Sequence, residues 1–354
     1  MRLIALLVPI FLILPQASGQ DLPAGERVVP SVVKAASAFL ETLDAAQRKS
    51  VLFSFDDHEQ RKRWSNLPTG IFQRKGLRWG DLKQEQRTAL MEILKATLSP
   101  EGVKQVVENM DGDEILKGGS SAGPGGRGPG GPRGRGPGGL VFGKDEYYFS
   151  ILGSPSETEP WMWQFGGHHL AVNATIVGDQ ITLAPSLTGG QPVDYELNGK
   201  KVRQLANEED TAFKLIKSLS PDQRKQAILD DHHADMIWGP GKEGAKPRNE
   251  GIKVSTFDEA QRKLFLELVG HRIGILNKTH ATSQLTKVAG ELDQTWFSWF
   301  GPIDPGAASS FRIQGPSILI EYAPQHMGGD STNHTHAMYR DPTNDYGTAF
   351  IRNR

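Results

Sequence analysis

The chain has 354 residues, of which 37% are hydrophobic and 23% are charged, and its formal net charge is −1. These values suit a folded protein of one large or two medium domains, and they provide no global charge to attract nucleic acid or an acidic membrane surface. Because the chain has no cysteine, disulfide scaffolds, zinc–thiolate sites, iron–sulfur clusters and cysteine nucleophiles are excluded.

The first 19 residues have the three-part pattern of a secretory signal peptide. Arg2 supplies the positive end, residues 3–14 are almost entirely apolar, and Ala17 and Gly19 place small residues before Gln20. The apolar run is short for a spanning helix, and no later stretch is long enough for one. We expect residues 1–19 to be removed and the mature chain to be exported, periplasmic or extracellular, without a membrane span. An uncleaved N-terminal anchor is the alternative.

A Gln-Arg pair recurs four times, each time four residues after an apolar residue. The pairs begin at Gln47, Gln86, Gln223 and Gln261. Their spacing indicates an internal duplication of about 175 residues. At three of them Asp or Ser precedes the Gln by three residues, which is the spacing of a capping box, so the pairs predict helix starts rather than catalytic groups.

Segments rich in aromatic and β-branched residues follow the helices and predict antiparallel strands. The expected strands cover residues 146–152, 161–166, 168–177 and 180–184, then 295–300, 310–314, 317–323 and 332–339. Residues 20–200 and 201–354 are thus each predicted to be a helical segment followed by a small β-meander. We expect an α+β fold in which these two pseudo-symmetric halves pack face to face about a pseudo-two-fold axis, as one unit.

Residues 118–139 interrupt the first half with a Gly-rich repeat that contains three arginines. Such a stretch cannot bury a core, and it is predicted to be a disordered insertion. An Arg-Gly tail that binds nucleic acid is the alternative, but three arginines make a weak electrostatic footprint. We therefore expect no nucleic-acid partner.

Two groups of histidines lie in the predicted meanders. His334 and His336 share one face of a strand, about 7 Å apart along it, so both could reach one metal ion. His168 and His169 open another strand and face opposite ways, and His169 is favoured because its face is the less apolar. The structural alternatives are half-exposed surface histidines and a histidine bonded to a turn carbonyl.

Three imidazoles from two strands, with an open coordination position, form a ligand set for Zn, Cu, Fe or Mn. Arg340 lies on the strand face of His334 and His336 and would bind an anionic group of a small-molecule substrate. Asp341 is a candidate catalytic residue, and Asp341 or Glu321 could complete the metal's ligands. Met338 on the same face would favour copper.

Two further clusters of acidic residues and histidine follow predicted helices, at residues 56–59 and 230–235. Charged helix ends explain them most simply, and a second metal site is the alternative. Motifs for P-loops, for HExxH zinc enzymes and for the GxSxG nucleophile are not found.

The segments 167–173, 185–189 and 334–347 resemble domain-of-unknown-function family 3500. The most specific part is the run from His334-Thr335-His336 to Tyr346-Gly347, and the resemblance extends over nearly the whole mature chain. It implies one integrated unit, but it implies no established reaction and supplies no catalytic residues.

Three functions are consistent with these patterns. The first is an exported metal-dependent enzyme, a hydrolase or an oxidoreductase, that acts on a small anionic substrate. The second is a non-catalytic exported protein that binds a metal or another ligand. The third is a metal-free hydrolase in which His, Asp and Arg act as acid, base and anion clamp. The sequence favours the metal-dependent enzyme.

Overall fold

The computed structural model describes residues 27–118, 139–327 and 329–352. The predicted signal peptide and nearly all of the Gly-rich insertion therefore lie outside the described residues. The helices are α1 (Val28–Glu41), α2 (Ala45–Val51), α3 (His58–Arg61), α4 (Gln84–Thr97), α5 (Pro100–Lys117), α6 (Ala206–Ser218), α7 (Pro221–Ala227), α8 (Glu259–Ile273), α9 (Lys278–Ala289) and α10 (Thr348–Arg352).

The strands include all eight predicted ones, with bounds that shift by up to three residues. They are β1 (Leu52–Phe53), β2 (Leu77–Arg78), β3 (Tyr148–Leu152), β4 (Trp161–Gly167), β5 (Leu170–Val177), β6 (Gln180–Thr182), β7 (Ser186–Gly190), β8 (Asp194–Leu197), β9 (Lys200–Arg203), β10 (Ile228–Asp230), β11 (Ile252–Lys253), β12 (Trp296–Phe300), β13 (Ser310–Gly315), β14 (Ile318–Pro324) and β15 (Thr335–Arg340).

One large mixed sheet organises the fold. In the described residues it has 13 strands, in the order β1-β3-β4-β5-β7-β15-β14-β13-β12-β10, with β2, β6 and β11 paired beside β3, β5 and β12. The β1–β3 and β10–β12 pairs are parallel, and the other neighbours are antiparallel. At the centre β7 pairs with β15, so the two predicted meanders join edge to edge instead of packing face to face. The protein is therefore mixed α/β, and its described residues form this continuous 13-stranded sheet and a separate two-stranded sheet of β8 and β9.

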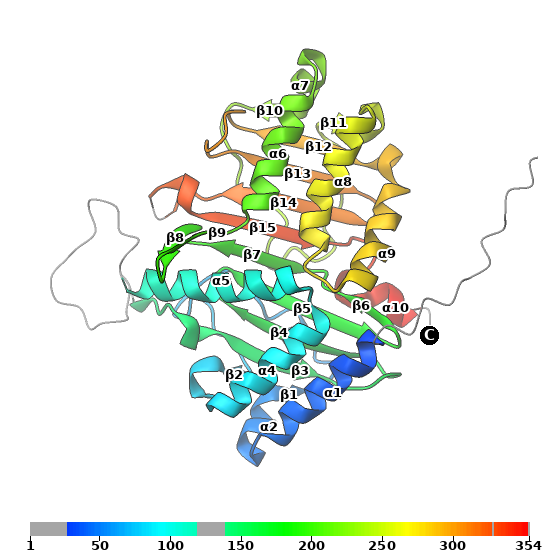
Figure 1. The fold of residues 1–354 in the computed structure, drawn as a ribbon. Helices are drawn as coiled ribbons and strands as arrows, with labels where there is room; N and C mark the ends of the chain where they lie inside the picture. The colour runs from blue at the N-terminus through cyan, green and yellow to red at the C-terminus, as the bar shows by residue number, and fades with distance from the viewer. Residues whose placement is uncertain (1–26, 119–138, 328, 353–354) are drawn as a thin grey trace, which may run out of the picture.

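Helices cover one face of this sheet. Figure 1 shows α1, α4, α5, α6, α8 and α9 lying across it. One buried apolar cluster joins α1, α4 and α5 to β3–β6, and a second joins α6, α8 and α9 to β12–β15. Edge-to-face aromatic pairs anchor both, with ring centroids 5.3 Å apart for Phe39–Phe149 and 5.1 Å apart for Phe213–Trp299.

The other face of the sheet is covered by chain segments rather than by long helices. Residues 54–76 place Trp64 in a third buried cluster with Leu187 of β7 and Met338 of β15. Residues 231–251 attach through backbone N–H groups, such as that of Trp238, which donates to the Glu321 carboxylate on β14 at 2.7 Å. Side chains on this face of β15 therefore lie between the sheet and these segments.

The Gln-Arg pairs do begin helices. Capping boxes form at α2, α7 and α8, as predicted. The glutamines also bond to one another: Gln86 Nε2 donates to Gln47 Oε1 at 2.8 Å, and Gln261 Nε2 donates to Gln223 Oε1 at 3.0 Å. Each bond ties two helix starts together, and the sequence did not predict it.

Candidate metal centre

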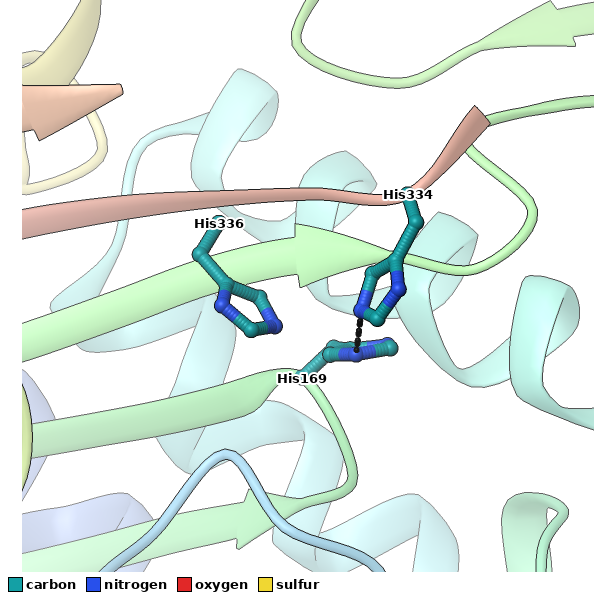
Figure 2. A group of neighbouring side chains, drawn as sticks. All are labelled: His169, His334 and His336. Atoms are coloured by element: carbon teal, nitrogen blue, oxygen red, sulfur yellow. Dashed lines mark hydrogen bonds between the residues drawn. The ribbon is translucent and has the colours of Figure 1, made fainter. Parts of the chain in front are cut away.

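Three histidines gather on the loop-covered side, where the central strands β7 and β15 meet the β4–β5 turn. His169 comes from that turn, His334 directly precedes β15, and His336 lies within it. One ring nitrogen from each lies within 4.8 Å of the others, and His169 Nε2 is 3.0 Å from His334 Nε2 (Figure 2). All three residues are buried, with 3–6% exposed. This is the set that the sequence predicted, with His169 as the third member.

Local backbone geometry directs the rings toward one another. His169 has a positive φ of 58°, and its N–H donates to the Asn66 carbonyl at 3.1 Å, which attaches the turn to the covering segment. On β7, Gly189 faces His336, and a Cβ there would approach the Thr335 carbonyl oxygen to 2.4 Å. Glycine at 189 is therefore required for β15 and its imidazole to lie this close to β7.

The tautomer of His334 is set by a backbone bond. Its Nδ1 lies 2.5 Å from the Met327 carbonyl oxygen, which can only accept, so Nδ1 carries the proton. Nε2 is then left with its lone pair directed toward His169. A carbonyl that fixes the distal nitrogen in this way is the usual support of a metal-ligating histidine.

His336 is the least satisfied member of the group. It is 4% exposed, and neither ring nitrogen has a hydrogen-bond partner among the described residues. Leaving a buried polar group unpaired costs about 1–3 kcal/mol, so native proteins rarely do so without a reason. A metal ion, if bound by this nitrogen, would supply such a reason.

The electrostatics keep the three rings neutral. Burial lowers the pKa of His334 to about 4, and burial together with the neighbouring histidines lowers the pKa values of His169 and His336 well below the ordinary value. Neutral imidazole is the form that binds a metal, so the site is ready for one at neutral pH.

These shifts predict how stability depends on pH in protein stripped of metal. Free histidine in the unfolded chain has a pKa near 6.5, so below that pH the unfolded state binds protons that the buried rings reject. The free energy of unfolding should therefore fall as the pH drops from 6.5 to about 5, by about 2 kcal/mol for His334, and the lowered pKa values of His169 and His336 should add to the fall. Urea unfolding at pH 7 and pH 5 with a chelator measures the loss. A His336→Leu variant should lose less than wild type, and an equal loss in both proteins would contradict the assignment.

His168 does not join the ring nitrogens of this group. Its Nδ1 bonds to Asp113 Oδ1 at 2.8 Å, and its ring lies against that of His169 with centroids 3.7 Å apart. Asp113 is a buried carboxylate on α5 that also accepts the Gly143 N–H at 2.9 Å. His168 thus supports the His169 ring. No motif around Asp113 in the sequence indicated this contact.

Arg340 lies elsewhere on β15, beyond Met338. Its guanidinium is fully buried: Nη1 donates to Asp345 at 2.7 Å, Nε to the Trp238 carbonyl at 2.7 Å and Nη2 to the Gly239 carbonyl at 2.9 Å. Met338 itself belongs to the apolar cluster around Trp64. The structure therefore does not bring Arg340 to the three histidines.

The predicted carboxylates also lie apart from the histidines. Asp341 follows β15 and lines a cavity of about 230 Å³ beside α9, where Lys287 lies 3.6 Å from its Oδ2 and Thr343 donates to its Oδ1. Glu321 on β14 accepts from Arg312 Nε at 3.0 Å and from the segment 237–238. The cluster thus consists of imidazoles alone.

The fold and the site together define a mixed α/β protein with a buried cluster of three neutral histidines. The model of the family described as "Protein of unknown function (DUF3500)" matches residues 26–348, and the chain belongs to this family. Neither the curated proteins nor the solved structures gave a match. Within the described residues, none of the helices has the length and apolar character to cross a membrane.

Proposed function

We propose that the protein is an exported metal-dependent enzyme, a hydrolase or an oxidoreductase, whose metal ion is held by His169, His334 and His336. The observation that carries the proposal is the buried His336 ring, which has no hydrogen-bond partner among the residues that the structure describes and whose nitrogen lies within 4.8 Å of nitrogens from two other neutral imidazoles. Export is proposed from the signal-peptide pattern of residues 1–19.

Three imidazoles suit a catalytic metal better than a structural one. Nitrogens bound tetrahedrally to zinc at 2.0–2.1 Å lie about 3.3 Å apart, and the His169 and His334 nitrogens are 3.0 Å apart. Three protein ligands leave a coordination position for water or substrate, where a metal would polarise a carbonyl, activate water or bind oxygen. Zn, Cu, Fe and Mn all accept this ligand set.

The burial of the three histidines limits the size of the substrate. With 3–6% of each histidine exposed, a small molecule is the substrate that could reach the ion. The anionic group expected from Arg340 is not part of this proposal, because that guanidinium is fully buried and bonded to Asp345 and to two backbone carbonyls.

The same burial favours a second candidate function, a non-catalytic exported protein that binds the metal. The two differ in whether the fourth coordination position admits an outside ligand. Azide added to protein loaded with Co²⁺ or Cu²⁺ should change the visible spectrum if the position is open. An unchanged spectrum would favour the binding protein.

Metal content tests both candidates against a metal-free function. Protein purified from its native host should carry about one equivalent of a transition metal, and His336→Ala protein should carry none at this site. His280→Ala is the matched control, because His280 on α9 bonds to Asn277 and to the Asp179 carbonyl, outside the cluster. Wild-type protein that contains no metal and gains no thermal stability from Zn, Cu, Mn or Fe would refute the proposal.

The proposal includes a duplicated chain, with residues 20–200 and 201–354 as the two halves of one unit. Three pairs of contacts support it: the Gln47–Gln86 and Gln223–Gln261 bonds, the parallel β1–β3 and β10–β12 pairs, and the antiparallel β2–β3 and β11–β12 pairs. In this arrangement the metal site lies where the halves meet, at β7 and β15.

A further inference from the structure

A second pair of imidazoles lies outside the three-histidine cluster. His233 follows β10 in the covering segment 231–251, and His326 follows β14. Their ring centroids are 4.0 Å apart at an interplanar angle of 32°. His326 is exposed, while His233 Nε2 is buried and has no hydrogen-bond partner among the described residues. An unpaired imidazole nitrogen beside a second imidazole is the kind of pair that binds a transition-metal ion.

Three consecutive residues connect this pair to the cluster. Gln325 Nε2 donates to Asp235 Oδ1 at 3.0 Å, His326 packs on His233, and the Met327 carbonyl accepts from His334. The Gln325 N–H also donates to the His334 carbonyl at 2.8 Å. Since adjacent Cα atoms are 3.8 Å apart, the two groups of histidines are neighbours in space.

The charges around the pair favour a cation. Asp235 lies beside it, and the exposed residues Asp230, at the end of β10, and Asp231 precede it in the chain. Burial and His326 lower the pKa of His233, and the Asp235 carboxylate opposes that shift. The same carboxylate acts on His334 in the same direction. Asp235 therefore exerts its negative potential on both groups of histidines.

We propose that His233 and His326 form an outer metal site that captures a divalent transition-metal ion at the surface and from which the buried cluster is loaded. The loading role rests on the proposed function, whereas the outer site itself does not. A buried metal site needs a route by which the ion arrives, and the segment 325–327 joins the surface pair to His334.

The outer site should bind more weakly than the cluster. In the described part of the chain, His169, His334 and His336 are the one group of three ligands this close together. The outer ion would thus have two imidazoles, with water or Asp235 in the remaining positions. Fewer protein ligands and greater exposure both lower the affinity, as capture followed by transfer requires.

Calorimetric titration of the full chain with Zn²⁺, after removal of metal, tests the outer site. Wild type should bind one equivalent tightly and a second more weakly. A His233→Ala/His326→Ala variant should lose the weaker equivalent and keep the tight one. The matched control is His232→Ala, since the His232 side chain is 91% exposed and lies next to His233 in the chain; it should keep both. Thermal unfolding without metal checks that each variant is folded.

The loading role is tested by rate. Stopped-flow absorbance with Cu²⁺ should show the cluster filling at least tenfold more slowly in the double variant than in wild type, and an unchanged rate would overturn the loading role. A wild type that binds one tight equivalent alone, or a double variant that keeps both equivalents, would overturn the outer site. If His336→Ala retains every equivalent while the double variant loses one, the proposed function fails and the outer site stands.

Discussion

A His336→Leu variant is expected to lose the stabilisation that a bound metal supplies, while its metal-free form remains at least as stable as wild type. The two effects have opposite causes. A ligand that binds the folded state alone stabilises it by about 4.1 kcal/mol at a thousand times its Kd, and the variant should lose essentially all of this. Without metal, leucine removes two buried nitrogens that have no hydrogen-bond partner in the described part of the chain, each of which costs about 1–3 kcal/mol in wild type.

Urea unfolding with Zn²⁺ and with a chelator measures both effects in the same two proteins. Met338→Leu is the matched control, because Met338 lies two residues further along the same strand face and in an apolar cluster. It should keep the response to metal and change the metal-free stability by less than about 1.5 kcal/mol. If His336→Leu is strongly destabilised with chelator present, the ring has a structural partner and the metal interpretation fails.

The alternation of side chains along a strand predicted which histidines form the candidate site. His334 and His336 were paired because alternate strand residues share a face, and His169 was preferred to His168 from the character of its face; all three do gather. Periodicity placed Arg340 on the face of His336 as well. Periodicity carried no information on the segment 231–251. The carbonyls of residues 238 and 239 in that segment accept hydrogen bonds from the Arg340 guanidinium.

The rest of the site depends on contacts between segments that are far apart in the chain, and the sequence did not predict these contacts. Asp113 lies 55 residues before His168 in the chain, and its helix gives no sign of the partner. The Met327 carbonyl that sets the tautomer of His334 is a backbone group, which any residue type would supply. Sequence patterns specify side-chain types, so a hydrogen bond from a histidine to a backbone carbonyl is found only from the structure.

The sequence predicted individual strands, but it did not predict how the two groups of strands pair with each other. The eight predicted strands are present, but β7 was not predicted, because its sequence Ser-Leu-Thr-Gly-Gly has neither alternating apolar residues nor β-branched enrichment. This strand joins the two meanders by pairing with β5 and β15. Without it, two separate meanders facing each other were the natural expectation. Its Gly189 is also what lets His336 lie close to β7.

Replacing Arg340 by leucine is expected to lower the free energy of unfolding by about 3–5 kcal/mol, the cost of breaking a buried ion pair. The variant leaves the half-buried Asp345 carboxylate without its 2.7 Å partner and frees the carbonyls at 238 and 239. Burial already raises the pKa of Asp345 to about 6, with Arg340 opposing that shift, so the carboxylate depends on the guanidinium for its charge.

Urea unfolding measures this loss, and two further variants identify its cause. Lys95→Ala, which removes an exposed pair with Glu92, should change stability by no more than about 0.5 kcal/mol. Adding Asp345→Asn to Arg340→Leu should recover part of the loss, because the uncompensated charge is removed together with its partner. Metal bound per folded molecule should equal the wild-type value, since Arg340 is no part of the three-histidine cluster. Unchanged stability together with lost substrate turnover would instead show that Arg340 contacts the substrate.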